Sequence, residues 1–280
     1  MPKIGKILDK HRKEKENRKM RSEMYQQVVR MEDSEEYSRL STNGIQALED
    51  QDYEDALRWL GEAIHLSGGK CFWDFYHRGM ALQALKRHEE AVEAFSRAIT
   101  LESREEKCYF FRGVSLLALG RYQESISDFS MAIGMRPEKP IAYFNRGFAY
   151  DRIGQSEKAL EDYGKAIELA PELPLSYNNR GLIYTKQGEF GRALSDLQHA
   201  LELSPEEPHI LNNLGYLYMK RAEPGDSELA LELFEKVLVL DPGFLSAYEN
   251  RAKLYRQLGQ IDLAERDEEK LRALKQPKET

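Results

Sequence analysis

The residues that could bind a metal ion or act as nucleophiles are few in this sequence, and they form no known catalytic pattern. The six histidines are His11, His65, His77, His88, His199 and His209. None belongs to an HExxH motif or to another paired spacing that binds a metal ion. The two cysteines, Cys71 and Cys108, are too few for a disulfide framework and show no metal-ligand spacing, so we expect free thiols. Because GxSxG, P-loop and dinucleotide-binding glycine motifs are also missing, the sequence predicts no enzyme, no metal site and no cofactor.

Asparagine recurs at a fixed spacing in the second half of the chain. Asn145, Asn179 and Asn213 lie 34 residues apart, and Asn250 continues the series. Asn178 and Asn212 directly precede two members of it. An asparagine amide donates and accepts hydrogen bonds at once, which matches the paired N–H and C=O groups of a peptide backbone. Two interpretations stay open: contact with a bound peptide, or a structural role.

Arginine and aspartate also recur, and they change together. The arginines are Arg78, Arg112, Arg146, Arg180 and Arg251, and the aspartates sixteen residues after four of them are Asp128, Asp162, Asp196 and Asp267. Where leucine replaces the arginine, at Leu214, the matching position is Leu233. A half-buried arginine without a partner is costly, so this covariation within one chain predicts ion pairs. Arg78, which faces Ala94, is the exception. The alternative is an arginine row that binds phosphate or carboxylate.

These spacings belong to a repeat that runs through most of the chain. The glycines Gly44, Gly79, Gly113, Gly147, Gly181 and Gly215 are separated by 35, 34, 34, 34 and 34 residues. Twelve residues after five of them stands a small residue, and an alanine follows seven residues later. Three repeats then place a proline, at Pro137, Pro171 and Pro205. A period of this length is typical of repeat architectures.

Within each period, apolar residues recur at three and four residues, which predicts a pair of antiparallel helices. Glycine and alanine allow the two helices to cross closely, and the proline stops the second helix. One such hairpin cannot bury its apolar face alone, so neighbouring repeats must stack. The predicted first helices begin near Glu35, Phe72, Glu106, Pro140, Pro174, Pro208 and Leu245.

The set Tyr143, Gly147, Tyr150, Ala159, Tyr163, Ala166 and Pro171 resembles the tetratricopeptide-repeat signature, and the resemblance covers roughly residues 35–275. It implies an all-α, right-handed superhelical solenoid of helix-turn-helix repeats over residues 34–275, with six full repeats and a capping seventh. The sixth repeat departs from the pattern by an insertion of three residues in the stretch 222–227. The seventh has Ala252 in place of glycine and ends in a highly charged helix, as a cap requires.

The resemblance also implies a concave groove, lined by the first helices, that binds an extended or helical segment of another protein. The residues that should face it are Trp73, Tyr76, Phe110, Phe144, Phe148, Asn145, Asn178, Asn179, Asn212, Asn213, Asn250, Lys186 and Lys220. The asparagines resemble the peptide-holding ladder of related solenoids such as the O-linked sugar transferase. The alternative for the aromatic residues is that they pack between repeats. A clamp for the C-terminus of the large chaperones is not expected, because no three successive repeats supply its lysine and asparagine set.

Charge and hydrophobicity limit the other classes of partner. Residues 1–33, for which we expect a frayed helix or disorder, belong to a basic N-terminus, whereas the total charge is −7. An acidic main body lacks the basic face that attraction to phosphates requires, which argues against nonspecific nucleic-acid binding, and we expect no specific nucleic-acid partner. The N-terminus carries no signal-peptide pattern and no apolar run approaches a membrane span, so we expect a cytoplasmic adaptor, with a disordered tail at 276–280. The alternative is a peripheral membrane-associated assembly factor anchored through Ile4, Ile7 and Leu8, although that apolar face is short. The partner's identity and the oligomeric state are not predicted.

Overall fold

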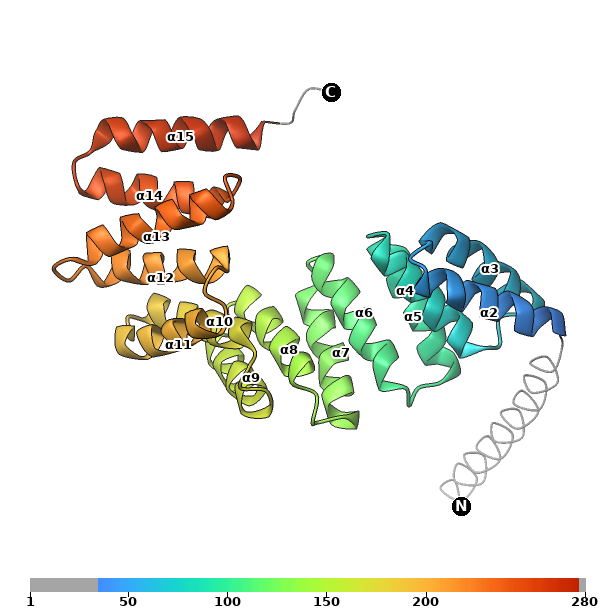
Figure 1. The fold of residues 1–280 in the computed structure, drawn as a ribbon. Helices are drawn as coiled ribbons and strands as arrows, with labels where there is room; N and C mark the ends of the chain where they lie inside the picture. The colour runs from blue at the N-terminus through green and yellow to red at the C-terminus, as the bar shows by residue number, and fades with distance from the viewer. Residues whose placement is uncertain (1–34, 277–280) are drawn as a thin grey trace, which may run out of the picture. The chain divides into compact units, whose positions relative to one another are not determined.

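The structure is a computed structural model that describes residues 35–276, and every regular element in that range is an α-helix. Each of seven repeats contributes two antiparallel helices (Figure 1). The first helices are α2 (Glu35–Glu49), α4 (Phe72–Ala84), α6 (Glu106–Ala118), α8 (Pro140–Arg152), α10 (Pro174–Gln187), α12 (Pro208–Arg221) and α14 (Leu245–Gln257). The predicted starts of all seven first helices are therefore confirmed.

The second helices pack against the first helix of the same repeat. They are α3 (Tyr53–Leu66), α5 (His88–Leu101), α7 (Tyr122–Met135), α9 (Ser156–Leu169), α11 (Phe190–Leu203), α13 (Asp226–Leu240) and α15 (Ile261–Lys275). Within each of the two compact units described below, each helix pair also packs against the next, so the predicted all-α tetratricopeptide solenoid is confirmed. The predicted N-terminal segment 1–33 and residues 277–280 of the predicted tail lie outside the described residues.

The chain divides into two compact units at Pro137. In the described part, unit 1 holds repeats 1 to 3, from α2 to α7, and unit 2 holds repeats 4 to 7, from α8 to α15. A single solenoid over residues 34–275 stays a prediction.

Helix boundaries follow from local backbone chemistry. α8, α10 and α12 each begin with proline, whose fixed φ suits the first helical position and whose missing N–H would have no partner there. Between the two helices of a repeat, the chain adopts positive φ at Gly120, Gly154, Gly188 and Gly259, where glycine carries no steric penalty. Gln51 and Lys86 occupy this place in repeats 1 and 2.

The repeated glycine marks the point where the two helices of a repeat approach most closely. A Cβ atom at Gly79 would lie 2.7 Å from the Phe95 ring, and one at Gly215 would lie 2.7 Å from the Phe234 ring. The large residue that meets the glycine is fully buried in each of the first six repeats: Leu60, Phe95, Phe129, Tyr163, Leu197 and Phe234. The core is thus a series of ring-on-glycine or leucine-on-glycine contacts, one for each of these repeats.

The predicted arginine–aspartate pairs are present, each with two hydrogen bonds between the two helices of one repeat. Their donor–acceptor distances are 2.7 and 2.7 Å for Arg112–Asp128, 2.8 and 2.8 Å for Arg146–Asp162, 2.7 and 2.8 Å for Arg180–Asp196, and 2.8 and 2.7 Å for Arg251–Asp267. In repeat 6, Leu214 and Leu233 belong to one apolar cluster instead. The four pairs are structural, which argues against a row of free arginines. Arg78 alone lacks the aspartate, and its buried Nε atom has no hydrogen-bond partner in the described residues.

Unit 1 contains a buried carboxylate that the sequence pattern does not reveal. Asp74, in the first turn of α4, is completely buried. The Tyr37 hydroxyl donates to its Oδ2 atom at 2.9 Å, and the Ser41 hydroxyl donates to its Oδ1 atom at 3.0 Å. Because Tyr37 and Ser41 belong to α2, these hydrogen bonds connect repeat 1 to repeat 2.

The insertion in repeat 6 forms an ordered turn between α12 and α13. Ala222 and Gly225 adopt positive φ in it. Arg221 donates two hydrogen bonds, of 2.9 and 2.7 Å, to the buried carboxylate of Asp226. These hydrogen bonds hold the pKa of Asp226 below its ordinary value. The turn is therefore fixed by an ion pair of its own.

Candidate peptide-binding surface

The asparagines of unit 2 form one continuous series of side-chain hydrogen bonds, which we name the amide string. It runs across the first helices α14, α12 and α10 and ends on a tyrosine of α9. The donors and acceptors are Asn250 to Asn212 at 3.2 Å, Asn212 to Asn213 at 3.4 Å, Asn213 to Asn178 at 3.0 Å, Asn178 to Asn179 at 3.1 Å, and Asn179 to the Tyr163 hydroxyl at 3.3 Å. Every amide NH₂ in the string donates to the next member in this order, so the string has one direction, from Asn250 to Tyr163.

Buried and accessible amides alternate along the string. Asn178 and Asn212 are buried, whereas Asn179, Asn213 and Asn250 are half-buried. A primary amide has two N–H donors and an oxygen with two lone pairs. Asn213 uses one donor and one lone pair within the string, which leaves one of each. The half-buried asparagines therefore have both a structural role and unused hydrogen-bonding capacity.

Asn145, the first asparagine of the series, stands apart from the string. It is half-buried, and its side chain has no hydrogen bond to any residue within 35–276. Its amide thus retains its full donor and acceptor capacity.

Tyr163 fixes the end of the string in the core of repeat 4. The side chain is completely buried, and burial raises the pKa of its phenol above the ordinary value, although the hydrogen bond from Asn179 opposes the shift. The hydroxyl stays neutral and accepts the Asn179 N–H. Sequence reasoning missed this residue as a polar partner, because phenylalanine or leucine occupies the equivalent position in the other five of the first six repeats.

Replacing Tyr163 by phenylalanine should lower the free energy of unfolding by about 1 kcal/mol, because it removes one hydrogen-bond acceptor and leaves the Asn179 N–H without a partner. Urea denaturation measures this value. The phenylalanine variant keeps the ring and its packing, so the measured change reports the hydroxyl alone. Tyr150→Phe is the control, because the half-buried Tyr150 hydroxyl has no hydrogen bond to the described residues. A loss no larger than that of the control would contradict the role of the string.

The predicted aromatic residues divide into packed and accessible ones. In unit 2, Phe144 packs against Tyr163 with ring centroids 5.8 Å apart, and Phe148 is half-buried with the Arg152 guanidinium 5.9 Å from its ring. For Phe144 the structure favours the packing interpretation. Phe148 remains partly accessible.

Unit 1 shows the same division. Tyr76 is buried against Phe95, whereas Trp73 is 39% exposed. Phe110 is half-buried and meets Phe129 edge to face at 5.8 Å. Trp73 is therefore the most accessible of the three predicted aromatic residues in this unit.

His77 extends this aromatic surface and was not among the predicted site residues. Its ring stacks on Trp73 at 5.8 Å and meets Tyr76 at 5.2 Å. Burial lowers the pKa of His77, so the ring is neutral at physiological pH. The signal for it was its place in the sequence, four residues after an exposed tryptophan on the same helix.

The two predicted lysines are both exposed. Lys186 Nζ lies 4.0 Å from a carboxylate oxygen of Asp151. Lys220 Nζ lies 5.6 Å from the centre of the Tyr216 ring and has no carboxylate within 4.0 Å in the described residues. Basic residues end α8, α10, α12 and α14, whereas α2, α4 and α6 have none in their last turn. Cations at helix C-termini also stabilise the helix, so basic residues at this position fit a binding role and a structural role equally.

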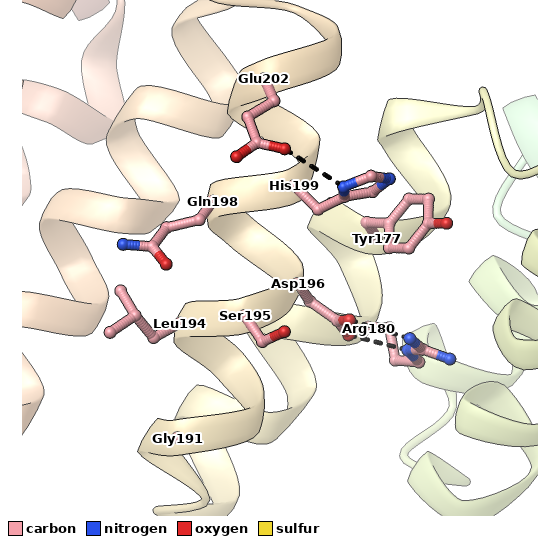
Figure 2. A pocket seen from close by; sticks show the side chains of 9 residues that line it. All are labelled: Tyr177, Arg180, Gly191, Leu194, Ser195, Asp196, Gln198, His199 and Glu202. Atoms are coloured by element: carbon pink, nitrogen blue, oxygen red, sulfur yellow. Dashed lines mark hydrogen bonds and ion pairs between the residues drawn. The ribbon is translucent and has the colours of Figure 1, made fainter.

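A surface pocket of about 600 Å³ lies beside the Arg180–Asp196 pair, at positions other than those predicted to face the groove (Figure 2). The Tyr177 and His199 rings meet at 4.5 Å on one side of it, and His199 Nδ1 lies 3.4 Å from Glu202. The pocket is open and polar, which does not suit an enzyme active site that excludes water.

Neither a metal site nor a membrane span is found among residues 35–276. No group of three or more histidine, cysteine, aspartate or glutamate side chains there could hold a metal ion. No helix in that range is long and apolar enough to cross a bilayer. The alternative of a membrane anchor at Ile4, Ile7 and Leu8 lies outside the described residues.

Sequence models of the tetratricopeptide repeat match three stretches of the chain, residues 75–104, 140–173 and 181–221. The matched stretches coincide with repeats of paired helices. The chain is a tetratricopeptide-repeat protein.

Solved structures share the fold of this tetratricopeptide-repeat protein at low sequence identity. A tetratricopeptide repeat protein from Parabacteroides merdae ATCC 43184 has a TM-score of 0.73 and 16% identity, over 88% of this chain and 96% of that one. PilF of Pseudomonas aeruginosa has a TM-score of 0.65 and 18% identity, over 78% and 98%. YrrB, described as a TPR protein with an unusual peptide-binding site, has a TM-score of 0.55 and 20% identity, over 68% and 96%. No curated protein matches the sequence.

Proposed function

We propose that this tetratricopeptide-repeat protein is a non-catalytic, cytoplasmic adaptor that binds a segment of a partner protein on its first helices. The observation that carries the proposal is the presence of half-buried amides with unused donors and acceptors, at Asn145, Asn179, Asn213 and Asn250. A water-facing row of such amides matches the backbone of an extended peptide. The peptide-binding site for which YrrB is described supports the same use of this fold.

Apolar anchors supply the affinity in this proposal, and the amides orient the bound backbone. Trp73 in unit 1 and Phe148 in unit 2 are the accessible aromatic residues. Large aromatic anchors carry most of the binding free energy in many protein interfaces. Phe110 and Phe144, whose rings contact the buried rings of Phe129 and Tyr163, shape the surface. Lys186 and Lys220 bind acidic groups of the segment.

The amide string gives the surface its order before any partner binds. Asn178 and Asn212 hold the neighbouring half-buried asparagines in fixed positions, so little conformational entropy is lost when a peptide binds. In this proposal Asn178 and Asn212 position the amides rather than touch the peptide.

The test is to capture partners with the wild-type protein, identify the bound segment, and measure its dissociation constant with variants. Trp73→Ala or Phe148→Ala should weaken binding roughly thirtyfold, which corresponds to about 2 kcal/mol. Asn145→Ala should weaken it about fivefold, because one exchanged hydrogen bond contributes about 1 kcal/mol.

The controls are exposed residues of second helices, changed in the same way. Met131→Ala, on α7, matches the aromatic variants, and Gln198→Ala, on α11, matches the asparagine variant. Circular dichroism must show wild-type helix content for each protein. Unchanged affinity in the folded Trp73, Phe148 and Asn145 variants would rule out this surface as the binding site.

A further inference from the structure

Surface pockets recur beside the arginine–aspartate pair in repeats 4 and 5. The repeat-4 pocket, of about 450 Å³, is lined by Tyr143, Arg146, Glu161, Asp162, Gly164, Lys165 and Glu168. The repeat-5 pocket has Tyr177, Arg180, Asp196, His199 and Glu202 at the equivalent positions. In both, the arginine is neutralised by the aspartate, and a second carboxylate stands near the end of the second helix. Figure 2 shows this arrangement for repeat 5. These grooves therefore contain their own anions.

The same positions in repeat 2 have lost both of these carboxylates. Sixty-eight residues before the repeat-4 set, the chain has Phe75, Arg78, Ala94, Arg97 and Thr100. Alanine thus replaces the paired aspartate, threonine replaces the second carboxylate, and arginine replaces Lys165. The equivalent positions of α4 and α5 thus carry two arginines, whereas the pockets of repeats 4 and 5 have balanced charges.

Neither arginine forms an ion pair within 4.0 Å with a carboxylate in the described part of the protein. Arg78 is half-buried and its buried Nε atom has no hydrogen-bond acceptor. Arg97 is exposed, and its guanidinium lies 5.9 Å from the centre of the Phe75 ring without an ion pair to any residue in 35–276. The nearby Glu90 accepts two hydrogen bonds, of 2.6 and 2.7 Å, from Arg87, which lower the pKa of its carboxyl. Arg78 adds to this lowering through its charge alone and makes no hydrogen bond to Glu90.

Glu93 is the remaining carboxylate of the equivalent set, corresponding to Glu161 in repeat 4, and it is exposed to solvent. One exposed carboxylate four residues before Arg97 cannot also satisfy the half-buried guanidinium of Arg78. A partly desolvated guanidinium without a counter-ion is unfavourable. Its planar donors match the oxygens of carboxylate and phosphate groups.

We propose that the surface of repeat 2 formed by α4 and α5 binds an external oxyanion, a carboxylate or a phosphate group, through Arg78 and Arg97. The oxyanion takes the place that the aspartate carboxylate occupies in repeats 3, 4, 5 and 7. This site uses positions of α4 other than those of the proposed peptide-binding surface, so it is a second and separate contact for an anionic group.

The test measures thermal unfolding of the full chain in sodium phosphate, sodium acetate and sodium chloride at equal ionic strength. Phosphate or acetate should raise the midpoint by roughly 2–4 °C over chloride at concentrations well above the dissociation constant. Two capped tripeptides, acetyl-Gly-Glu-Gly-amide and acetyl-Gly-phosphoserine-Gly-amide, distinguish a protein side chain from the free ion. A tripeptide that acts at lower concentration than its free ion identifies the side chain as the source.

The decisive variant is Ala94→Asp, which places a carboxylate beside Arg78 as Asp162 stands beside Arg146. Its midpoint in chloride should be higher than that of the wild type, and its response to phosphate and acetate should disappear. Arg97→Gln should also lose the response, which keeps the test valid if Ala94→Asp fails to fold. The matched control, Ala84→Asp, adds the same charge at an exposed residue of α4 and should respond like the wild type. A wild-type response equal in all three salts, or one that persists in Ala94→Asp, would overturn the proposal.

Discussion

Replacing Asp196 by alanine should lower the free energy of unfolding by about 2–4 kcal/mol. The carboxylate is buried and accepts two hydrogen bonds, of 2.7 and 2.8 Å, from Arg180. Removing this carboxylate leaves the Arg180 guanidinium without a counter-ion, although the Arg180 side chain is only 23% exposed. Breaking one partner of a buried ion pair commonly costs several kcal/mol, and the partial exposure of Arg180 places the expected value toward the lower end. Urea denaturation followed by circular dichroism measures it.

The double variant Arg180→Leu/Asp196→Leu should recover most of that loss. Repeat 6 already carries Leu214 and Leu233 at these positions, in an apolar cluster. Arg78→Leu is the control, since it removes an arginine with no aspartate partner and should cost little or even stabilise the protein. A double variant less stable than Asp196→Ala would show that the two positions do not form an independent, replaceable pair.

The second large effect concerns the ring that meets the repeated glycine. Replacing Phe234 by alanine should lower the free energy of unfolding by about 3–5 kcal/mol, because a completely buried ring is lost and a cavity remains. Gly215→Ala alone should cost about 1–3 kcal/mol, since the added Cβ would lie 2.7 Å from the Phe234 ring.

The combination Gly215→Ala/Phe234→Ala should cost less than the sum of the single changes, because the new methyl group enters space that the ring has left. Repeat 7 shows the same compensation: Ala252 stands in place of glycine, and the residue that would meet it is Glu268, whose carboxylate is bound by Arg256. A double-mutant cycle in denaturant measures the coupling. Strict additivity would mean that the glycine and the ring do not limit each other.

Much of this architecture follows from spacing alone. A period of 34 residues sets the register of the helix pairs: glycine and alanine mark where the two helices cross closely, and proline marks a helix end or start because it fixes φ and lacks an N–H. The arginine–aspartate contacts follow from the joint loss of both charges at Leu214 and Leu233. Both inferences can be made without knowing how far one repeat is rotated relative to the next.

The candidate site depends on that rotation, and this is why it was predicted less completely. The spacing shows that Asn178 and Asn213 lie in corresponding turns of α10 and α12. It does not show that they lie within hydrogen-bonding distance of each other, as they do in the structure. Whether Trp73 or Tyr76 is accessible depends on how Phe95 and Phe111 pack around them. The boundary at Pro137 is likewise invisible in the sequence, since the period continues through it unchanged.

The amide string has a consequence for how unit 2 opens in solution. A repeat protein behaves as a linear array in which each interface adds its own coupling to the stability of its neighbours. Asn250 and Asn213 add a polar coupling at two successive interfaces, in the same direction. Fraying of α14 therefore removes the donor to Asn212 and weakens the next interface in turn. Amide protons of α10, α12 and α14 should then exchange with solvent with similar opening free energies, as one cooperative block.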